Sequence, residues 1–96
     1  MNVHLFLHLQ WRSRQARIKA LNSTDKDERR QLLAESEENL RRCLSMDSSD
    51  PRTYVVLGKL LMMQKRYQEA RALYSEGVAN TGEDTNYAHS TMFSEV

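Results

Sequence analysis

The amino-acid sequence predicts an all-α fold made of antiparallel helical hairpins. Apolar residues recur three and four residues apart in several stretches, which is the spacing of one helix face. The 96 residues include only one proline and three glycines, so long helices are not interrupted. Residues 50–82 contain two periodic runs separated by a short polar turn. We therefore expect one good hairpin there and one imperfect hairpin before it.

The first helix of the good hairpin is expected to begin at Asp50 and Pro51. Asp is a favourable N-cap, and a proline at the first helical position loses no hydrogen bond that the helix needs. The apolar face that follows consists of Tyr54, Leu57, Gly58 and Leu61. Residues 64–66, Gln-Lys-Arg, interrupt this pattern and are predicted to form the turn.

The second helix of this hairpin is predicted from another periodic run. Its members are Tyr67, Ala70, Leu73, Tyr74, Gly77 and Val78. Gly82 suits the left-handed position that ends a helix. Small residues alternate with tyrosines in both helices, which predicts a close helix approach with Tyr54, Tyr67 and Tyr74 packed in the core.

The pattern of residues 50–82 resembles the tetratricopeptide repeat (TPR). The resemblance is carried by Tyr54-x-x-Leu57-Gly58, by Tyr67-x-x-Ala70 and by Tyr74, with Gly77 in place of the usual Ala. More narrowly, the stretch resembles the half-a-TPR (HAT, or RNA-TPR) repeats of plant and algal proteins that mature and stabilise chloroplast photosystem II messenger RNAs. The resemblance implies an α-solenoid, a non-catalytic scaffold in RNA processing and a chloroplast location. A cytoplasmic adaptor for protein–protein interaction is the alternative.

Residues 25–49 are predicted to supply the second helix of an imperfect preceding repeat. Thr24-x-x-Asp27 approximates a capping box at its start. A shift of 34 residues, the TPR period, superimposes this helix on the second helix of the good hairpin. Its predicted apolar face is Leu32, Leu33, Leu40, Cys43 and Leu44. Cys43 occupies a small-residue position, which favours a buried thiol over a nucleophile.

Residues 1–24 carry four basic residues and no acid, and they are interpreted as a basic helix or an organelle presequence. The predicted apolar side of the helix is Leu5, Leu9, Trp11, Ala16, Ile18 and Leu21. Trp11 is expected to cover the core; stacking on a nucleic-acid base is the alternative.

Residues 83–96 are expected to be a frayed tail or the start of a truncated repeat. A solenoid that stops within a repeat leaves an apolar flank uncovered. Val55, Met62 and Met63 are the expected uncovered strip. The sequence is thus interpreted as a fragment, a truncated product, or a chain that self-associates through this strip.

An enzyme is not predicted, and neither is a cofactor. His4 and His8 are one turn apart, but no third ligand is placed near them for zinc. No Gly-rich phosphate loop and no paired nucleophile and base occur. The apolar runs are also too short for a membrane span.

Two kinds of partner remain, RNA and protein. The candidate RNA-binding residues are Arg41, Arg42, Arg52, Lys59, Lys65, Arg66 and Arg71. These cations would meet phosphates along a helical surface. The candidate protein-binding groove is lined by Val55, Lys59, Met62 and Met63. Methionine adapts readily to different apolar partners, which makes it suitable there.

Overall fold

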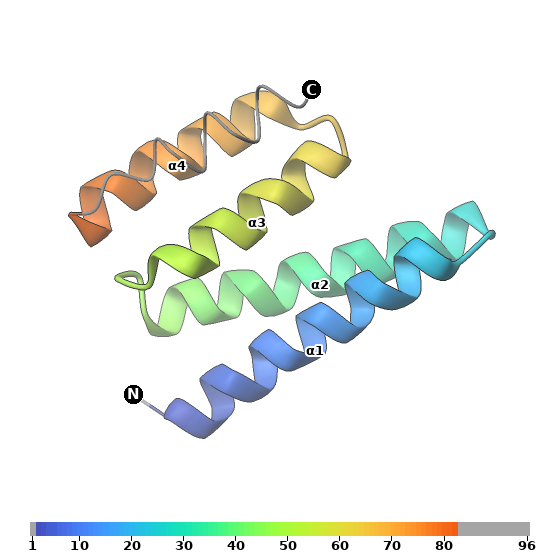
Figure 1. Cartoon of the computed structure of the whole chain (residues 1–96), viewed down its shortest axis with the longest axis horizontal. Helices are drawn as coiled ribbons and strands as arrows, with labels where there is room; N and C mark the ends of the chain where they lie inside the picture. The colour runs from blue at the N-terminus through green and yellow to red at the C-terminus, as the bar shows by residue number, and fades with distance from the viewer. Residues whose placement is uncertain (1, 83–96) are drawn as a thin grey trace. The chain divides into compact units, whose positions relative to one another are not determined.

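A computed structural model describes residues 2–82, and they are helical along most of their length (Figure 1). The described part contains four helices: α1 (Val3–Asn22), α2 (Lys26–Met46), α3 (Pro51–Met63) and α4 (Tyr67–Thr81). The chain divides after Met46 into two compact units. Each unit is a helical hairpin, α1 with α2 and α3 with α4. The predicted all-α fold is confirmed. The predicted tail or truncated repeat at 83–96 lies outside the described residues.

The helices of the first hairpin are capped at both starts by side chains. Asn2 Oδ1 accepts a hydrogen bond from the Leu5 amide at 3.0 Å. Asp25 Oδ1 accepts from the amides of Asp27 at 2.9 Å and Glu28 at 3.4 Å. The predicted cap at Thr24 is therefore wrong by one residue. A carboxylate at Asp25 satisfies two free amides and also carries the charge that the helix dipole favours.

The buried face of α1 differs from the one that the sequence predicted. Its members follow a spacing of three and four residues: Phe6, Leu9, Ser13, Ala16 and Ala20. Leu9 and Ala16 were predicted correctly. The predicted members Leu5, Trp11, Ile18 and Leu21 are exposed instead. Ser13, Ala16 and Ala20 give the later part of this face small side chains, whereas Leu5, Trp11, Ile18 and Leu21 lie out of phase with it.

Two serines meet at the centre of the first hairpin. Ser13 Oγ lies 2.7 Å from Ser36 Oγ, and it also donates to the Ser36 carbonyl at 3.1 Å. Arg17 Nη1 donates to Ser13 Oγ at 2.7 Å. The pKa of Arg17 is lowered, first because the group is partly buried and second because Arg14 is close. This cluster satisfies buried hydroxyls and so fixes the register of the two helices.

Cys43 packs in a small apolar cluster at the N-terminal end of α1. Its neighbours are Phe6 and Leu9, and its thiol donates to the Phe6 carbonyl at 3.6 Å. The side chain is fully buried, so the predicted core thiol is confirmed. Leu40 of the predicted α2 face is also buried. Leu32, Leu33 and Leu44 are only half-buried, while Ser36 and Asn39 are buried beside Leu40.

The second hairpin begins and ends as the sequence predicts. Asp50 Oδ1 accepts from the Arg52 amide at 3.0 Å, and Pro51 holds the first helical position. Gly82 adopts a left-handed conformation, with φ of 69°. The turn is Gln64–Arg66, and Lys65 in it has a φ of 62°. A lysine in this region is uncommon, because its Cβ is crowded there.

Glycines and tyrosines interlock between α3 and α4. A Cβ built on Gly58 would overlap the ring and hydroxyl of Tyr74. A Cβ built on Gly77 would lie 2.8 Å from Cγ of Tyr54. Both tyrosines are buried, and burial raises the pKa of Tyr74 to about 12. The predicted pairing of small residues with Tyr54 and Tyr74 is therefore confirmed.

The hydroxyl of Tyr54 forms hydrogen bonds both to the segment before α3 and to the end of α4. It donates to the Ser48 carbonyl at 2.7 Å and accepts from Asn80 Nδ2 at 2.9 Å. Tyr67, by contrast, is 36% exposed, so its predicted place in the core is wrong. It is the first residue of α4, beside the turn, where the helix leaves its side chain in solvent. Val78 is likewise exposed.

Candidate nucleic-acid interface

The seven predicted RNA-binding cations are distributed over both hairpins. Arg41 and Arg42 lie on α2, and the other five lie on α3, on α4 or in the turn between them. All are exposed except Arg66, which is half-buried. The two groups are described separately, since each hairpin is a unit of its own.

Three of these arginines are held by carboxylates. Arg41 Nε lies 3.0 Å from Glu37 Oε2, and Arg52 Nη2 lies 3.2 Å from Asp50 Oδ2. The hydrogen bond that Arg52 donates to Asp50 raises the pKa of the Arg52 guanidinium. The third pair is two-pronged, because Arg66 donates to both carboxylate oxygens of Glu69, at 2.6 and 2.8 Å.

The arginine of each pair is partly or largely exposed, so each pair contributes at most about 1 kcal/mol. The local positive potential is nevertheless reduced at all three arginines. They are weaker phosphate sites than the sequence alone indicated.

Three other predicted cations have no carboxylate partner within residues 2–82. They are Arg42 on α2, Lys59 on α3 and Lys65 in the turn. Lys65 projects from the left-handed turn position, where its backbone leaves the helix path. Arg71 lies exposed on α4. Unpaired cations keep their full charge for a polyanion, so Arg42, Lys59 and Lys65 are the better phosphate candidates.

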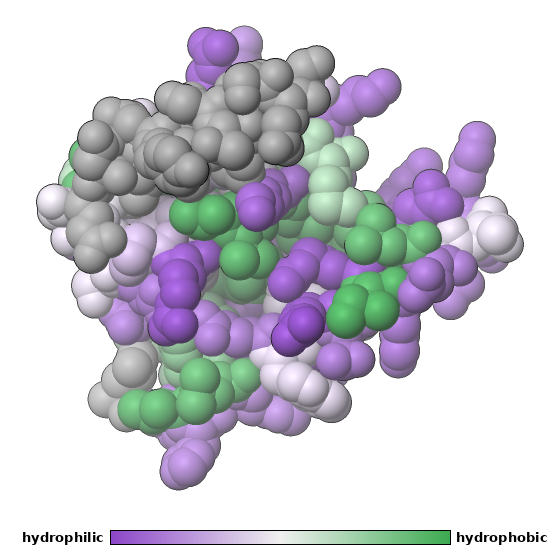
Figure 2. Space-filling model, viewed as in Figure 1, coloured by the Kyte–Doolittle hydropathy of each residue, from purple (hydrophilic) through white to green (hydrophobic). Residues whose placement is uncertain are grey.

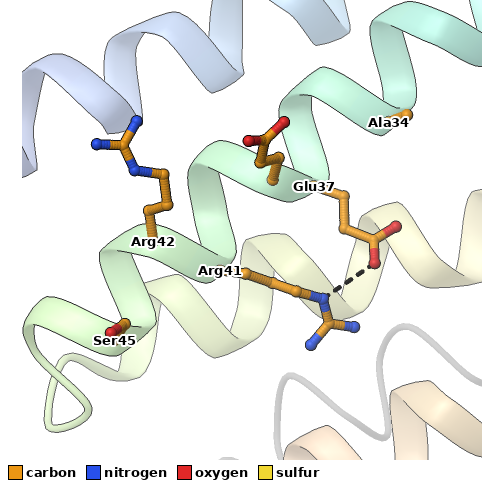
Figure 3. Close-up of a pocket in the computed structure, with 6 residues that line it drawn as sticks. Ala34, Glu37, Arg41, Arg42 and Ser45 are labelled. Carbon is orange, nitrogen blue, oxygen red and sulfur yellow. Dashed lines mark hydrogen bonds and ion pairs between the residues drawn. The ribbon is translucent and has the colours of Figure 1, made fainter.

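A shallow pocket on α2 contains Arg41 and Arg42, the two predicted RNA-binding residues of the first hairpin (Figure 3). It is lined by Ala34, Glu37, Glu38, Arg41, Arg42 and Ser45. Figure 3 shows Arg42 directed to the side of α1, while Arg41 points the other way and meets Glu37. Two acids and two bases share this surface. It is therefore a mixed charged face and not a cradle for phosphate.

The predicted protein-binding residues share one face of α3. Val55, Lys59, Met62 and Met63 are four, seven and eight residues apart, counted from Val55, which places them on adjacent helical turns. Val55 and Met62 are half-buried, and Met63 is 48% exposed. This face offers a modest apolar surface with one cation in it.

A further surface, which the sequence reasoning interpreted differently, lies on α1. Trp11 is 58% exposed, so the predicted role of covering the core is wrong. The ring of His8 stacks against it, with centroids 6.0 Å apart and planes 24° from parallel. A pocket between α1 and α2 is lined by Trp11, Arg12, Gln15, Ala16, Lys19, Leu32 and Glu35. The spacing of Phe6, Leu9, Ser13, Ala16 and Ala20 was the signal that would have placed Trp11 outside.

The rest of the exposed side of α1 is partly apolar. Val3, Leu7, Ile18 and Leu21 are exposed on it. Figure 2 shows apolar atoms, in green, interrupting the hydrophilic surface near the N-terminal end of α1. Within residues 2–82, no helix is both long and apolar enough to cross a bilayer. In the same range, no three His, Cys, Asp or Glu side chains gather in a way that could hold a metal ion.

Comparison with known proteins then decides the family. The family profile of the tetratricopeptide repeat matches residues 31–91, which is more than half of the chain. The chain belongs to the tetratricopeptide repeat family. This agrees with the small-to-large packing of Gly58, Tyr74, Gly77 and Tyr54 described above.

Two relatives of this tetratricopeptide chain have names that mention the chloroplast or chlorophyll. The chain is 52% identical over 87 residues to the PsbB mRNA maturation factor Mbb1, chloroplastic, of Chlamydomonas reinhardtii. It is 38% identical over 53 residues to Protein high chlorophyll fluorescent 107 of Arabidopsis thaliana. These matches cover 91% and 55% of the chain. They span only 13% and 8% of the relatives' own lengths. No solved structure matches the chain significantly.

The family match indicates a helical-repeat scaffold, and one of the two relatives is by its name an mRNA maturation factor. The chloroplast location implied by the sequence resemblance is supported in the same way.

Proposed function

We propose that this chain is an RNA-binding repeat segment of a chloroplast messenger RNA maturation factor. The observation that carries the proposal is the 52% identity to Mbb1, whose name assigns it to the maturation of PsbB mRNA. The chain spans a small part of that protein, so the segment would act as one section of a longer binding surface. Bound RNA would be protected and held by this surface without any chemical step in the chain itself.

The exposed cations support RNA as the partner. Lys59 and Lys65 have no carboxylate partner within the described residues and lie in the same hairpin. Each would meet a phosphate as a mobile point charge, releasing condensed counterions. Affinity in such a complex depends mainly on salt and only weakly on base sequence.

The test is a pair of double variants that remove equal charge. Lys59→Ser with Lys65→Ser removes two proposed phosphate contacts. Lys26→Ser with Arg30→Ser removes two exposed cations from the start of α2, which also lack a carboxylate partner in the described part of the chain. Binding is measured by fluorescence anisotropy of a labelled single-stranded RNA at several salt concentrations.

The Lys59/Lys65 variant is expected to bind more weakly, and its slope of log affinity against log salt should fall by about 1.4. The Lys26/Arg30 control should keep the slope of the unchanged chain. Equal slopes for the two variants would contradict the placement of phosphates at Lys59 and Lys65. Absence of RNA binding by the unchanged chain would contradict the function itself.

Protein recognition is the second candidate, and the apolar face of α3 favours it. Met63 is half-exposed beside the half-buried Met62 and Val55. Their sulfur atoms and methyl groups do not bind phosphate, but they suit an apolar partner. A partner held there, including a second copy of the chain, would bind with little dependence on salt. Met62→Ser with Met63→Ser should then abolish partner binding while RNA affinity is retained.

We further propose that residues 1–24 act as part of the folded repeat. Phe6 and Leu9 are buried and pack with Cys43 of α2, so removal of α1 would uncover that cluster. A chain that begins at Asp25 should accordingly lose the unfolding transition of the first hairpin.

A further inference from the structure

We propose that Trp11 is a stacking platform for a base of single-stranded RNA, with Lys19 and Arg12 beside it for the adjacent phosphates. The proposal rests on the RNA-binding function proposed above and assigns a specific contact to it. It concerns the first hairpin alone, where every residue involved lies on α1 or α2.

The exposure and orientation of Trp11 carry the first step. A tryptophan in a core buries a large apolar area. Trp11 is 58% exposed, so contact of its apolar surface with water costs free energy. His8 stacks near it at 6.0 Å and 24°, which restricts the orientation of the indole. A restricted, exposed indole presents a flat face on which any base can stack.

The charge around Trp11 carries the second step. Four cations and no acid occur on α1. Lys19 and Arg14 are exposed and have no carboxylate partner in the described range. Arg12 lies 3.4 Å from Glu35, a long contact in which both side chains are about half exposed. A surface pair of this length is weak, so a phosphate can displace Glu35 from Arg12.

The pocket between the two helices joins these groups. Trp11, Arg12, Gln15 and Lys19 line the same hollow, with Glu35 on the opposite helix. Gln15 is four residues after Trp11 and lines the same hollow, so its amide is available to hydrogen-bond a base edge. This hollow therefore suits a nucleotide: the indole can stack on the base, the amide can hydrogen-bond the edge of the base, and the two cations can contact the phosphate.

An apolar protein partner is the other occupant to consider. Val3, Leu7, Ile18 and Leu21 make part of α1 apolar, and Trp11 lies at the edge of that stripe, four residues after Leu7, with His8 and Gln15 on its other side. The basic charge of α1 matches a polyanion, and the indole matches its bases. RNA would use both the basic charge and the indole, whereas an apolar helix would use only the indole.

Trp11 is the only tryptophan of the chain, so its emission reports this site alone. The experiment titrates the full chain with unlabelled oligouridine RNA of about 12 nucleotides, within the length range of single-strand sites. Binding of the same RNA, labelled, is followed in parallel by anisotropy. Heparin serves as a polyanion without bases.

RNA is expected to quench Trp11 emission with the same midpoint as the anisotropy change, while heparin binds with little quenching. Trp11→Leu should weaken RNA binding about fivefold or more, the range found for loss of one base–aromatic stack. Trp11→Phe should keep most of the affinity. Leu21→Ala, which trims another exposed apolar side chain of α1, should change nothing. Far-ultraviolet circular dichroism checks that all variants fold.

Binding by anisotropy with unchanged Trp11 emission, or full affinity in Trp11→Leu, would overturn the stacking platform and leave the proposed function standing. Equal quenching by heparin would also overturn it, because stacking would not be the cause. Absence of RNA binding by the unchanged chain would overturn the proposed function and the platform together.

Discussion

The two hairpins of this chain pack their helices together with different side chains. In the second, glycines face tyrosines, Gly58 against Tyr74 and Gly77 against Tyr54. In the first, Cys43 occupies the position that precedes Gly77 by 34 residues, and it packs with Phe6 and Leu9. Phe6 and Leu9 are smaller than the tyrosines, so the first hairpin has room for Cys43 where the second has Gly77. The interface is therefore specified by paired volumes more than by any single residue type.

The hairpins also differ in what they leave exposed. The first is longer, with helices of 20 and 21 residues against 13 and 15, and it presents an acid-free α1 with an exposed tryptophan. In the second, Arg52 and Arg66 are neutralised by neighbouring carboxylates. The regular hairpin thus has the clearer family pattern, and the irregular hairpin has the more distinctive surface.

The largest expected effect comes from a charge placed inside the regular hairpin. Ala70 is fully buried on α4, so Ala70→Arg would force a guanidinium into the helix contact. A loss of about 4 kcal/mol in the free energy of unfolding is expected, because a buried charge without a partner is strongly destabilising. Ala72→Arg, on the exposed side of the same helix, is the control. Similar melting of the two variants would refute the placement of Ala70.

Gly58→Ala sharpens the comparison of paired volumes. The added methyl group would overlap Tyr74, and the expected cost is about 1–3 kcal/mol, less the helical preference of alanine over glycine. In a Tyr74→Leu chain, which adopts the leucine found at position 40, the same substitution should cost little or be stabilising. The double-mutant cycle is measured by urea unfolding. Additive effects would contradict the interlock.

The pH dependence of stability isolates the buried Tyr74. Its folded pKa is about 12, above the unfolded value near 10, so the neutral phenol is favoured by the fold. The stabilising contribution is complete below about pH 10 and is lost as the pH rises through about 12. Tyr74→Phe should show a smaller loss of unfolding free energy over this range, with lysine titration common to both chains. Identical profiles would place Tyr74 in solvent.

The smallest expected effect concerns Glu35, beside the stacking platform. Glu35→Gln should change stability by no more than about 0.5 kcal/mol, since its pair with Arg12 is long and exposed. RNA affinity should rise about twofold, because Arg12 is then free for phosphate. Glu76→Gln, which removes an exposed acid from α4, controls for net charge. A fall in RNA affinity for Glu35→Gln would argue against the site.

The sequence predicted most of the regular hairpin, because its signals are local and strong. Asp50 and Pro51 begin α3, and Gly82 ends α4, each through backbone chemistry that depends on one or two residues. The spacing of Tyr54, Gly58 and Tyr74 likewise indicated the contact. The prediction that Tyr67 is buried was wrong, because Tyr67 lies in the first turn of its helix, where burial depends on neighbours outside the hairpin pattern.

The phase of α1 could not be predicted from the size of its apolar residues. Leu5, Trp11, Ile18 and Leu21 are larger than Ser13, Ala16 and Ala20, yet the buried face of α1 carries the three smaller residues. Small residues permit close packing, but they contribute little hydropathy.

For the cations, Arg41 follows Glu37 by four residues and Arg66 precedes Glu69 by three, which are spacings at which helical side chains can form ion pairs. Which cations stay unpaired depends on side-chain positions that the sequence does not contain.

The most direct test of an RNA-binding scaffold is the affinity of the unchanged chain for single-stranded RNA at rising salt. The measurement uses anisotropy of labelled RNA between about 50 and 200 mM salt. The account predicts binding at low salt that weakens with a slope of about −1.4 or steeper, as expected for two or more phosphate contacts. Absence of binding at the lowest salt, or affinity that does not change with salt, would contradict it.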